Sequence, residues 1–183
     1  DPFRVNEVPN DLERIVVGVD PAVTSNNSSD HTGIVVCGSK TIGGTEHYFV
    51  LRDCSLIAAP ERWARCVVEC YESFSADLVV AEVNQGGDLV ESVLRNIAPN
   101  LPVKKVRATR GKIIRAEPIS TLYAQGRVHH VGYFEELENE MTSYVGISST
   151  EDSPDRMDAL VWALTELSTG AEVDARHGEL YFD

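Results

Sequence analysis

The sequence lacks several features that would assign it to a large class of proteins. It contains no run of about 18 or more apolar residues, which excludes a membrane-spanning helix. Its first five residues, Asp-Pro-Phe-Arg-Val, include no initiator methionine and no signal-peptide layout, so we expect a fragment of a longer protein or a processed chain. Internal repeats and low-complexity tracts are absent as well. The 183 residues suffice for one domain with a full core but not for two.

Cysteine is scarce, with four residues in the chain, and none forms a CxxC pair or stands near histidines at zinc-ligand spacing. Cys66 and Cys70 lie one helical turn apart, which by itself is half of a metal site. We expect all four, Cys37, Cys54, Cys66 and Cys70, to be buried free thiols of an intracellular protein.

Positive charge is also in short supply, because 16 Lys and Arg against 29 Asp and Glu leave a net charge of -13. This balance disfavours a stand-alone DNA-binding module, since phosphate binding is driven by Lys and Arg. The basic residues are unevenly spread, however. One stretch has no acid between its members: Lys104, Lys105, Arg107, Arg110, Lys112 and Arg115. A catalytic domain whose partner holds the DNA is compatible with this pattern.

Apolar runs and helical periodicity predict one α/β domain over residues 14–169, with a polar lead-in at 1–13 and a polar tail at 170–183. Strands are expected at 15–19, 33–38, 47–51, 78–83 and 103–106, with a small extra strand at 128–131. Helices are expected at 60–74, 88–98, 112–125, 135–144 and 154–168. Short turns join the first three strands, which indicates an antiparallel meander. We therefore expect a mixed sheet of five strands, or slightly more, flanked by helices.

Three acids occupy positions that an apolar core disfavours. Asp20 ends the first buried strand, and Glu82 interrupts the apolar fourth strand. Asp158 borders the apolar face of the last helix, and Asp155 lies three residues before it on the same side. If the first and fourth strands are parallel neighbours, Asp20 and Glu82 emerge at the same edge of the sheet. The pattern thus predicts carboxylates that meet in space.

Converging carboxylates repel one another unless a cation lies between them, and hard oxygen ligands favour Mg²⁺ or Mn²⁺. Two such ions about 3.5–4 Å apart support phosphodiester hydrolysis. Simpler interpretations stand beside this one. Asp20 is also a turn former, Glu82 is compatible with a buried ion pair, and Asp155 fits the positive end of a helix better than a metal site. Asp30, in a polar loop, is an auxiliary ligand candidate.

Four short strings resemble the C-terminal nuclease domain of the large terminase subunit of tailed bacteriophages. They are VGVDPA at 17–22, SDHTGIVV at 29–36, VAEVNQGG at 80–87 and SPDRMDAL at 153–160. Each string alone is weakly specific, but the four follow the order and approximate spacing of the family over residues 14–168.

The resemblance implies an RNase H-like endonuclease that cuts concatemeric viral DNA into genome lengths with two divalent ions, Mg²⁺ or Mn²⁺. By position, Asp20, Glu82 and Asp158 match the acidic triad, and Asp30 and Asp155 match accessory acids. The basic stretch around Lys112 and Arg115 falls where the family places residues that face DNA phosphates.

The resemblance also implies the setting: the cytoplasm of a bacterial host, with double-stranded DNA, the terminase small subunit and the portal protein as partners. The whole family protein carries an N-terminal packaging ATPase, and this chain has no phosphate-binding loop. We therefore expect the nuclease half alone.

Rival hypotheses remain open at this point. Another RNase H-like nuclease, such as a resolvase or transposase core, shares the acids, and a non-catalytic module that docks a motor to a portal needs none of them. A third alternative is a sugar-kinase-like ATPase, but this sequence has no glycine-rich phosphate hairpin near Asp20, which argues against it. No general base is evident: His31, His129 and His130 are available, but we expect the last two in a surface turn. With no groove-reading helix in sight, we expect cleavage of low sequence preference.

Overall fold

The computed structural model describes residues 3–21, 31–83, 88–143 and 154–177, and of residues 88 and 171–177 it describes the backbone. Its eight strands are β1 (Arg4–Val5), β2 (Arg14–Asp20), β3 (His31–Ile42), β4 (Thr45–Asp53), β5 (Leu56–Ile57), β6 (Leu78–Glu82), β7 (Val103–Val106) and β8 (Val128–Val131). Its five helices are α1 (Pro60–Ser73), α2 (Asp88–Ile97), α3 (Lys112–Ala124), α4 (Glu135–Ser143) and α5 (Asp155–His177).

The strands form one mixed sheet in the order β1-β8-β4-β3-β2-β6-β7, with β5 paired to the start of β3. Strands β2, β3 and β4 make the expected antiparallel meander. Strand β6 lies parallel to β2, and β7 lies parallel to β6. The carboxyl ends of β2 and β6 therefore meet at one edge of the sheet.

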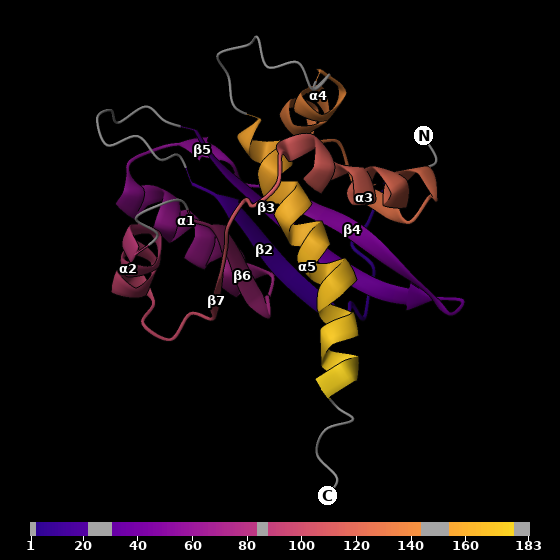
Figure 1. Cartoon of the computed structure of the whole chain (residues 1–183), viewed down its shortest axis with the longest axis horizontal. Coiled ribbons are helices and arrows are strands. Elements are labelled where there is room, and N and C mark those ends of the chain that lie inside the picture. Colours follow the sequence, from indigo (N-terminus) through magenta and orange to yellow (C-terminus); the bar gives the residue numbers. More distant parts are fainter. Residues whose placement is uncertain (1–2, 22–30, 84–87, 144–153, 178–183) are drawn as a thin grey trace, which may run out of the picture.

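Both faces of the sheet are covered, which explains why β2 is apolar at consecutive positions. Successive side chains of a strand point to opposite faces. Val17 and Val19 pack with α1 and α2 on one face, whereas Val16 packs with α3, α4 and α5 on the other. Figure 1 shows α5 lying across the sheet over β2 and β3.

Two glycines let α5 approach the sheet closely. A Cβ at Gly18 would collide with the carbonyl oxygen of Ala159, and a Cβ at Gly33 would collide with that of Asp155. These neighbours on β2 and β3 thus leave room for the backbone of α5 itself. The first turns of α5 are pressed against the strand that ends at Asp20.

The expected fold class is confirmed, and the structure extends it. Residues 4–5, within the expected lead-in, add a strand beside β8. The helix expected at 154–168 continues to His177. A strand of two residues is too short to leave a pattern, and Gly170 does not interrupt the helix. None of the helices in the described part of the chain has the length and apolarity of a bilayer span.

Candidate active site

Asp20 and Glu82 end two neighbouring strands. In the parallel ladder of β2 and β6, Val19 is the register partner of Ala81, so the two acids stand one residue beyond that pair. This juxtaposition is the one expected from the sequence. It arises because an apolar run in each strand ends at the acid, whose side chain reaches the edge of the sheet.

Asp158 reaches the same place from α5. Asp158 is 2% exposed and lies in the first turn of α5. The backbone of this turn lies against Gly33 of β3. Because Gly33 is the register partner of Asp20, this contact brings the start of α5 to the end of β2. Asp155 lies in the same turn. The structure therefore gathers acids from three separate parts of the chain.

Burial and crowding raise the pKa values of two of these acids, Asp20 and Asp158. Burial, together with the negative charges of Glu82, Asp158 and Asp155, raises the pKa of Asp20 from its ordinary value to about 8. Burial also raises the pKa of Asp158, although Lys112 and Arg115 oppose the shift. A site that disfavours its own carboxylate charges favours a bound cation.

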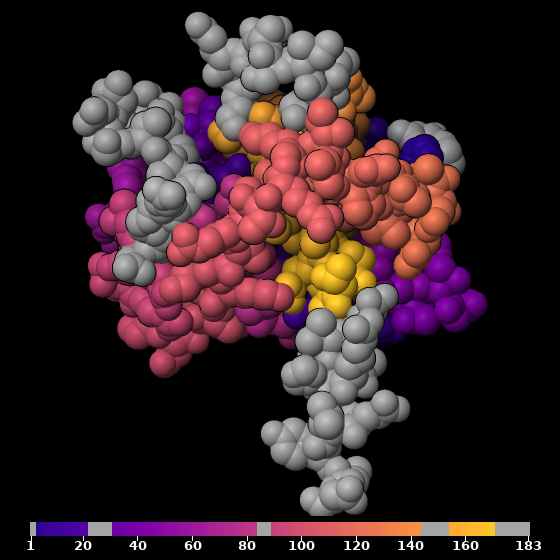
Figure 2. Space-filling view, viewed as in Figure 1, coloured from indigo at the N-terminus to yellow at the C-terminus, as the bar shows by residue number. Residues whose placement is uncertain are grey.

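Two cations of α3 already lie among the acids. The ammonium of Lys112 forms an ion pair with Asp158. Arg115 places Nη1 3.4 Å from Glu82 and Nη2 3.7 Å from Asp158. Burial lowers the pKa of Lys112, but its hydrogen bond and attraction to Asp158 prevail and the pKa is raised. Figure 2 shows the segment that contains α3 (orange-red) covering much of α5 (gold).

Trp162 belongs to this cluster, and the sequence analysis missed it. Its Nε1 donates a 2.6 Å hydrogen bond to Glu82, and the guanidinium carbon of Arg115 lies 4.9 Å from the centroid of its ring. A signal was available, because Trp162 stands four residues after Asp158 and so shares its face of the helix.

The rest of the basic stretch divides between ion pairs and the surface. Lys104 pairs with Glu166 of α5 at 2.6 Å, and Lys105 pairs with Glu91 of α2 at 2.6 Å. Arg107 and Arg110 are exposed in the connection between β7 and α3. All four of these basic residues are exposed, and their contact with DNA stays a prediction. Asp30, the other expected ligand, lies outside the described residues.

The residues present fit a divalent metal by their chemistry. The donors are carboxylate oxygens, the ligands that Mg²⁺ and Mn²⁺ prefer. Lys112 and Arg115 already bring positive charge to Asp158 and Glu82. In this arrangement, no three His, Cys, Asp or Glu side chains of the described residues are set to hold a metal ion. Loading would require the carboxylates to exchange their contacts with these two side chains for contacts with the metal.

His129, His130 and the cysteines lie on other parts of the fold, whereas His31 opens β3 two residues before Gly33. The expectation of a surface turn is wrong for His130, which is buried in β8 between the hydroxyl of Tyr123 at 2.7 Å and Glu138 at 2.9 Å. The four cysteines are free, as expected.

The expected burial of the cysteines holds only in part. Cys37 and Cys70 are buried, whereas Cys54 and Cys66 are half-buried. Cys54 adds a third thiol beside the pair on α1, since its Sγ lies 2.8 Å from that of Cys70.

The raised pKa of Asp20 predicts that its ionisation destabilises the metal-free chain. Between pH 4 and pH 8 the folded state holds a proton that the unfolded state releases, so this contribution to stability is lost as pH rises toward about 8. Asp20→Asn, which cannot ionise, should therefore be more stable than the native chain at pH 9, by about 1–3 kcal/mol. Urea unfolding at pH 5 and pH 9 with a chelator measures this. Glu61→Gln, at an exposed ion pair of α1, is the control, and an equal pH dependence of Asp20→Asn and the native chain would contradict the prediction.

The comparisons with known proteins agree with this geometry. The sequence model of one family, described as "Terminase RNaseH-like domain", matches residues 17–167. The phage P22 large terminase nuclease domain is 10% identical, with a TM-score of 0.66 over 91% of this chain and 88% of that one. The large terminase nuclease of thermophilic phage G20c with bound magnesium is 15% identical, with a TM-score of 0.64 over 89% and 86%.

A protein of another name, RuvC, shares the fold with a lower TM-score. Thermus thermophilus RuvC is 17% identical, with a TM-score of 0.52 over 85% of this chain and 94% of that one. At identities this low the structural likeness shows the fold alone, which is the RNase H-like fold of the matching family model. No curated protein sequence matches the chain significantly.

Proposed function

This chain belongs to the Terminase RNaseH-like domain family, and from that premise we propose that it is a divalent-metal-dependent endonuclease acting on viral double-stranded DNA. The observation that carries the proposal is the meeting of Asp20, Glu82 and Asp158 at one edge of the sheet. A buried cluster of carboxylates costs stability, which a purely structural site has no reason to keep.

Asp20, Glu82 and Asp158 are the residues that would hold the metal, with Asp155 as an accessory acid. Two bound Mg²⁺ or Mn²⁺ ions would supply an activated water and charge stabilisation for the leaving oxygen of a phosphodiester. The carboxylates would hold the ions from rigid elements, two strand ends and a helix. Trp162, hydrogen-bonded to Glu82, restricts the orientation of that carboxylate.

Lys112 and Arg115 have two roles in the proposal. In the metal-free chain they neutralise Asp158 and Glu82. With the carboxylates engaged by metal, the same side chains would contact a DNA phosphate beside the scissile bond. The exposed Arg107 and Arg110 extend this positive surface along the connection to α3.

The biological substrate that we propose is concatemeric viral DNA, cut during genome packaging in the cytoplasm of a bacterial host. The packaging ATPase domain, the terminase small subunit and the portal protein would bring the DNA to the site. A net charge of -13 is compatible with this arrangement, because such partners would supply much of the grip on DNA. The boundaries of the nuclease domain, residues 14–169, stay a prediction.

Incubation of supercoiled plasmid with the chain and Mn²⁺ or Mg²⁺ tests the proposal. We expect nicked and then linear plasmid, with cut positions scattered along the sequence, and no cleavage when a chelator removes the metal. Discrete fragments would contradict the low sequence preference. A chain that neither binds Mn²⁺ nor cuts would instead be a docking module.

A synthetic four-way junction, compared with a linear duplex of the same sequence, separates the terminase-like activity from a resolvase. A terminase-like nuclease should cut both substrates at similar rates. Preferential, symmetric cutting of the junction would favour a resolvase.

A further inference from the structure

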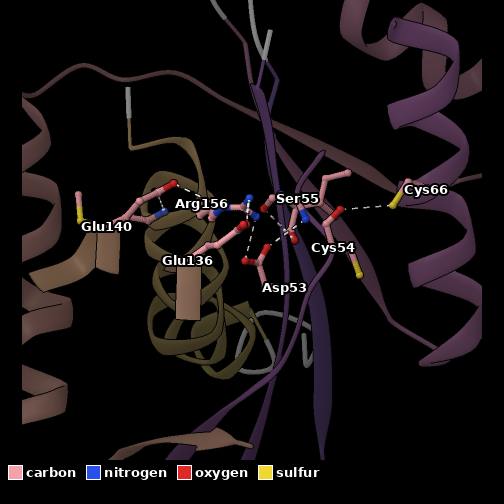
Figure 3. Close-up of polar contacts among 9 residues, drawn as sticks. Asp53, Cys54, Ser55, Cys66, Glu136, Glu140 and Arg156 are labelled. Carbon is pink, nitrogen blue, oxygen red and sulfur yellow. Dashed lines mark hydrogen bonds and ion pairs between the residues drawn. The ribbon is translucent and has the colours of Figure 1, made fainter. Parts of the chain in front are cut away.

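Arg156 is a buried cation in the first turn of α5, and it is held by carboxylates from two other elements. It is 8% exposed. Its Nη1 lies 3.0 Å from Asp53 at the end of β4, its Nη2 contacts Glu136 of α4, and its Nε lies 3.5 Å from Glu140 of α4. Figure 3 shows Arg156 between these three acids. Because each carboxylate faces a different nitrogen, the three acids together fix the position of the planar guanidinium.

Glu140 also binds the backbone of α5. Its second carboxylate oxygen accepts a 3.0 Å hydrogen bond from the N–H of Met157. The first N–H groups of a helix have no partner within the helix, and here an acid of α4 supplies one. Asp53 is itself fixed, because it accepts a 3.0 Å hydrogen bond from the N–H of Ser55. The first turn of α5 is therefore tied to a strand and to a second helix.

This turn carries Asp158, which comes from a helix, whereas Asp20 and Glu82 come from two strand ends. Strand ends are held by their own ladder, but the start of α5 depends on what packs around it. We propose that Arg156 and Glu140 are positioning residues that set the place of Asp158 in the metal site. The inference rests on the proposed nuclease function. Loss of the contacts of Arg156 or Glu140 should therefore lower the metal affinity of the site, while the rest of the fold stays intact.

The same helix provides a matched control. Arg14 of β2 forms an ion pair of 2.9 Å with Glu166, which is 7% exposed and lies about two turns beyond Asp158. Removing either arginine breaks a buried ion pair of α5. Only Arg156 lies in the turn that carries Asp158. A comparison of the two separates general loss of stability from misplacement of Asp158.

For the native chain, Arg156→Ala, Arg156→Lys, Glu140→Gln and Arg14→Ala, the experiment measures the melting temperature, the Mn²⁺ dissociation constant by titration calorimetry without DNA, and the Mn²⁺ concentration that gives half-maximal plasmid cleavage. For Arg156→Ala we expect an increase of about 10–100-fold in that concentration, the range seen when a group that orients metal ligands is lost. Arg156→Lys should restore part of the affinity, since an ammonium pairs with one acid but lacks the fork. Arg14→Ala should lower the melting temperature and keep the Mn²⁺ requirement within about twofold.

Two results would overturn the inference in distinguishable ways. If the native chain cuts DNA and Arg156→Ala has the same Mn²⁺ requirement as Arg14→Ala, the positioning role is wrong and the nuclease function stands. If the native chain neither binds Mn²⁺ nor cuts, the proposed function fails and the positioning role fails with it. Glu140→Gln keeps the shape of the side chain, so it supplies the same comparison where Arg156→Ala does not fold.

Discussion

Replacement of Asp20 or Asp158 by asparagine is expected to reduce DNA cleavage by roughly 10³-fold or more, equivalent to about 4 kcal/mol of transition-state stabilisation. Asparagine has nearly the same shape as aspartate but no charge, so it cannot neutralise a divalent ion. In both variants the contacts that place β2 and α5 remain. Rates of supercoiled-plasmid loss with saturating Mn²⁺ measure the effect, and a circular dichroism spectrum establishes that each variant folds.

The two substitutions should differ in one respect that identifies the site. Asp158→Asn removes the carboxylate that forms the ion pair with Lys112, whereas Asp20→Asn removes the carboxylate whose pKa is raised to about 8. Asp20→Asn should therefore lose activity and gain stability in the metal-free state. Glu61→Gln, on the exposed surface of α1, should leave the cleavage rate unchanged. Undiminished scission by either asparagine variant would refute the assignment of these acids.

Gly33→Ala should be the most damaging single-methyl substitution near the site. The added Cβ would overlap the carbonyl oxygen of Asp155, and backbone of a helix cannot yield as a flexible side chain does. We expect a loss of at least about 1–3 kcal/mol of unfolding free energy, and a melting temperature lower by roughly 2–4 °C for each kcal/mol. Cleavage should fall as well, because α5 has to move away from Asp20 to make room.

Gly111→Ala is the control for this substitution. A Cβ at Gly111 would meet nothing within 4 Å, and its φ of -58° suits alanine. We expect a change in stability of no more than about 0.5 kcal/mol. A similarly small change for Gly33→Ala would show that α5 does not lie as closely on β3 as the structure has it.

Much of this architecture could be predicted from local patterns. The apolar runs around Val17 and Val80 indicated buried strands, and the acids that ended them indicated a site at one sheet edge. These inferences succeed because a strand or helix leaves a periodic trace in the few residues that form it. The two-residue β1 and the burial of His130 left no such trace.

Contacts between residues that are distant in the chain were harder to predict from the sequence. Lys112 and Arg115 stood in a basic stretch that indicated DNA contact, yet in the structure they pair with Asp158 and Glu82. The spacing of Trp162 from Asp158 indicated a shared helix face but not the hydrogen bond to Glu82. Each of these contacts joins segments that are placed independently, so neither segment alone encodes the distance between them.

The sequence by itself determined the class of fold and the family, because both are encoded in short strings and in periodicity, and it predicted which acids form the site. Only the tertiary structure decided that α5 lies on Gly18 and Gly33, that Arg156 ties its first turn to β4 and α4, and that two cations of α3 stand among the acids. The physical reason is that side-chain charges interact over a few ångströms in space, whatever their separation along the chain.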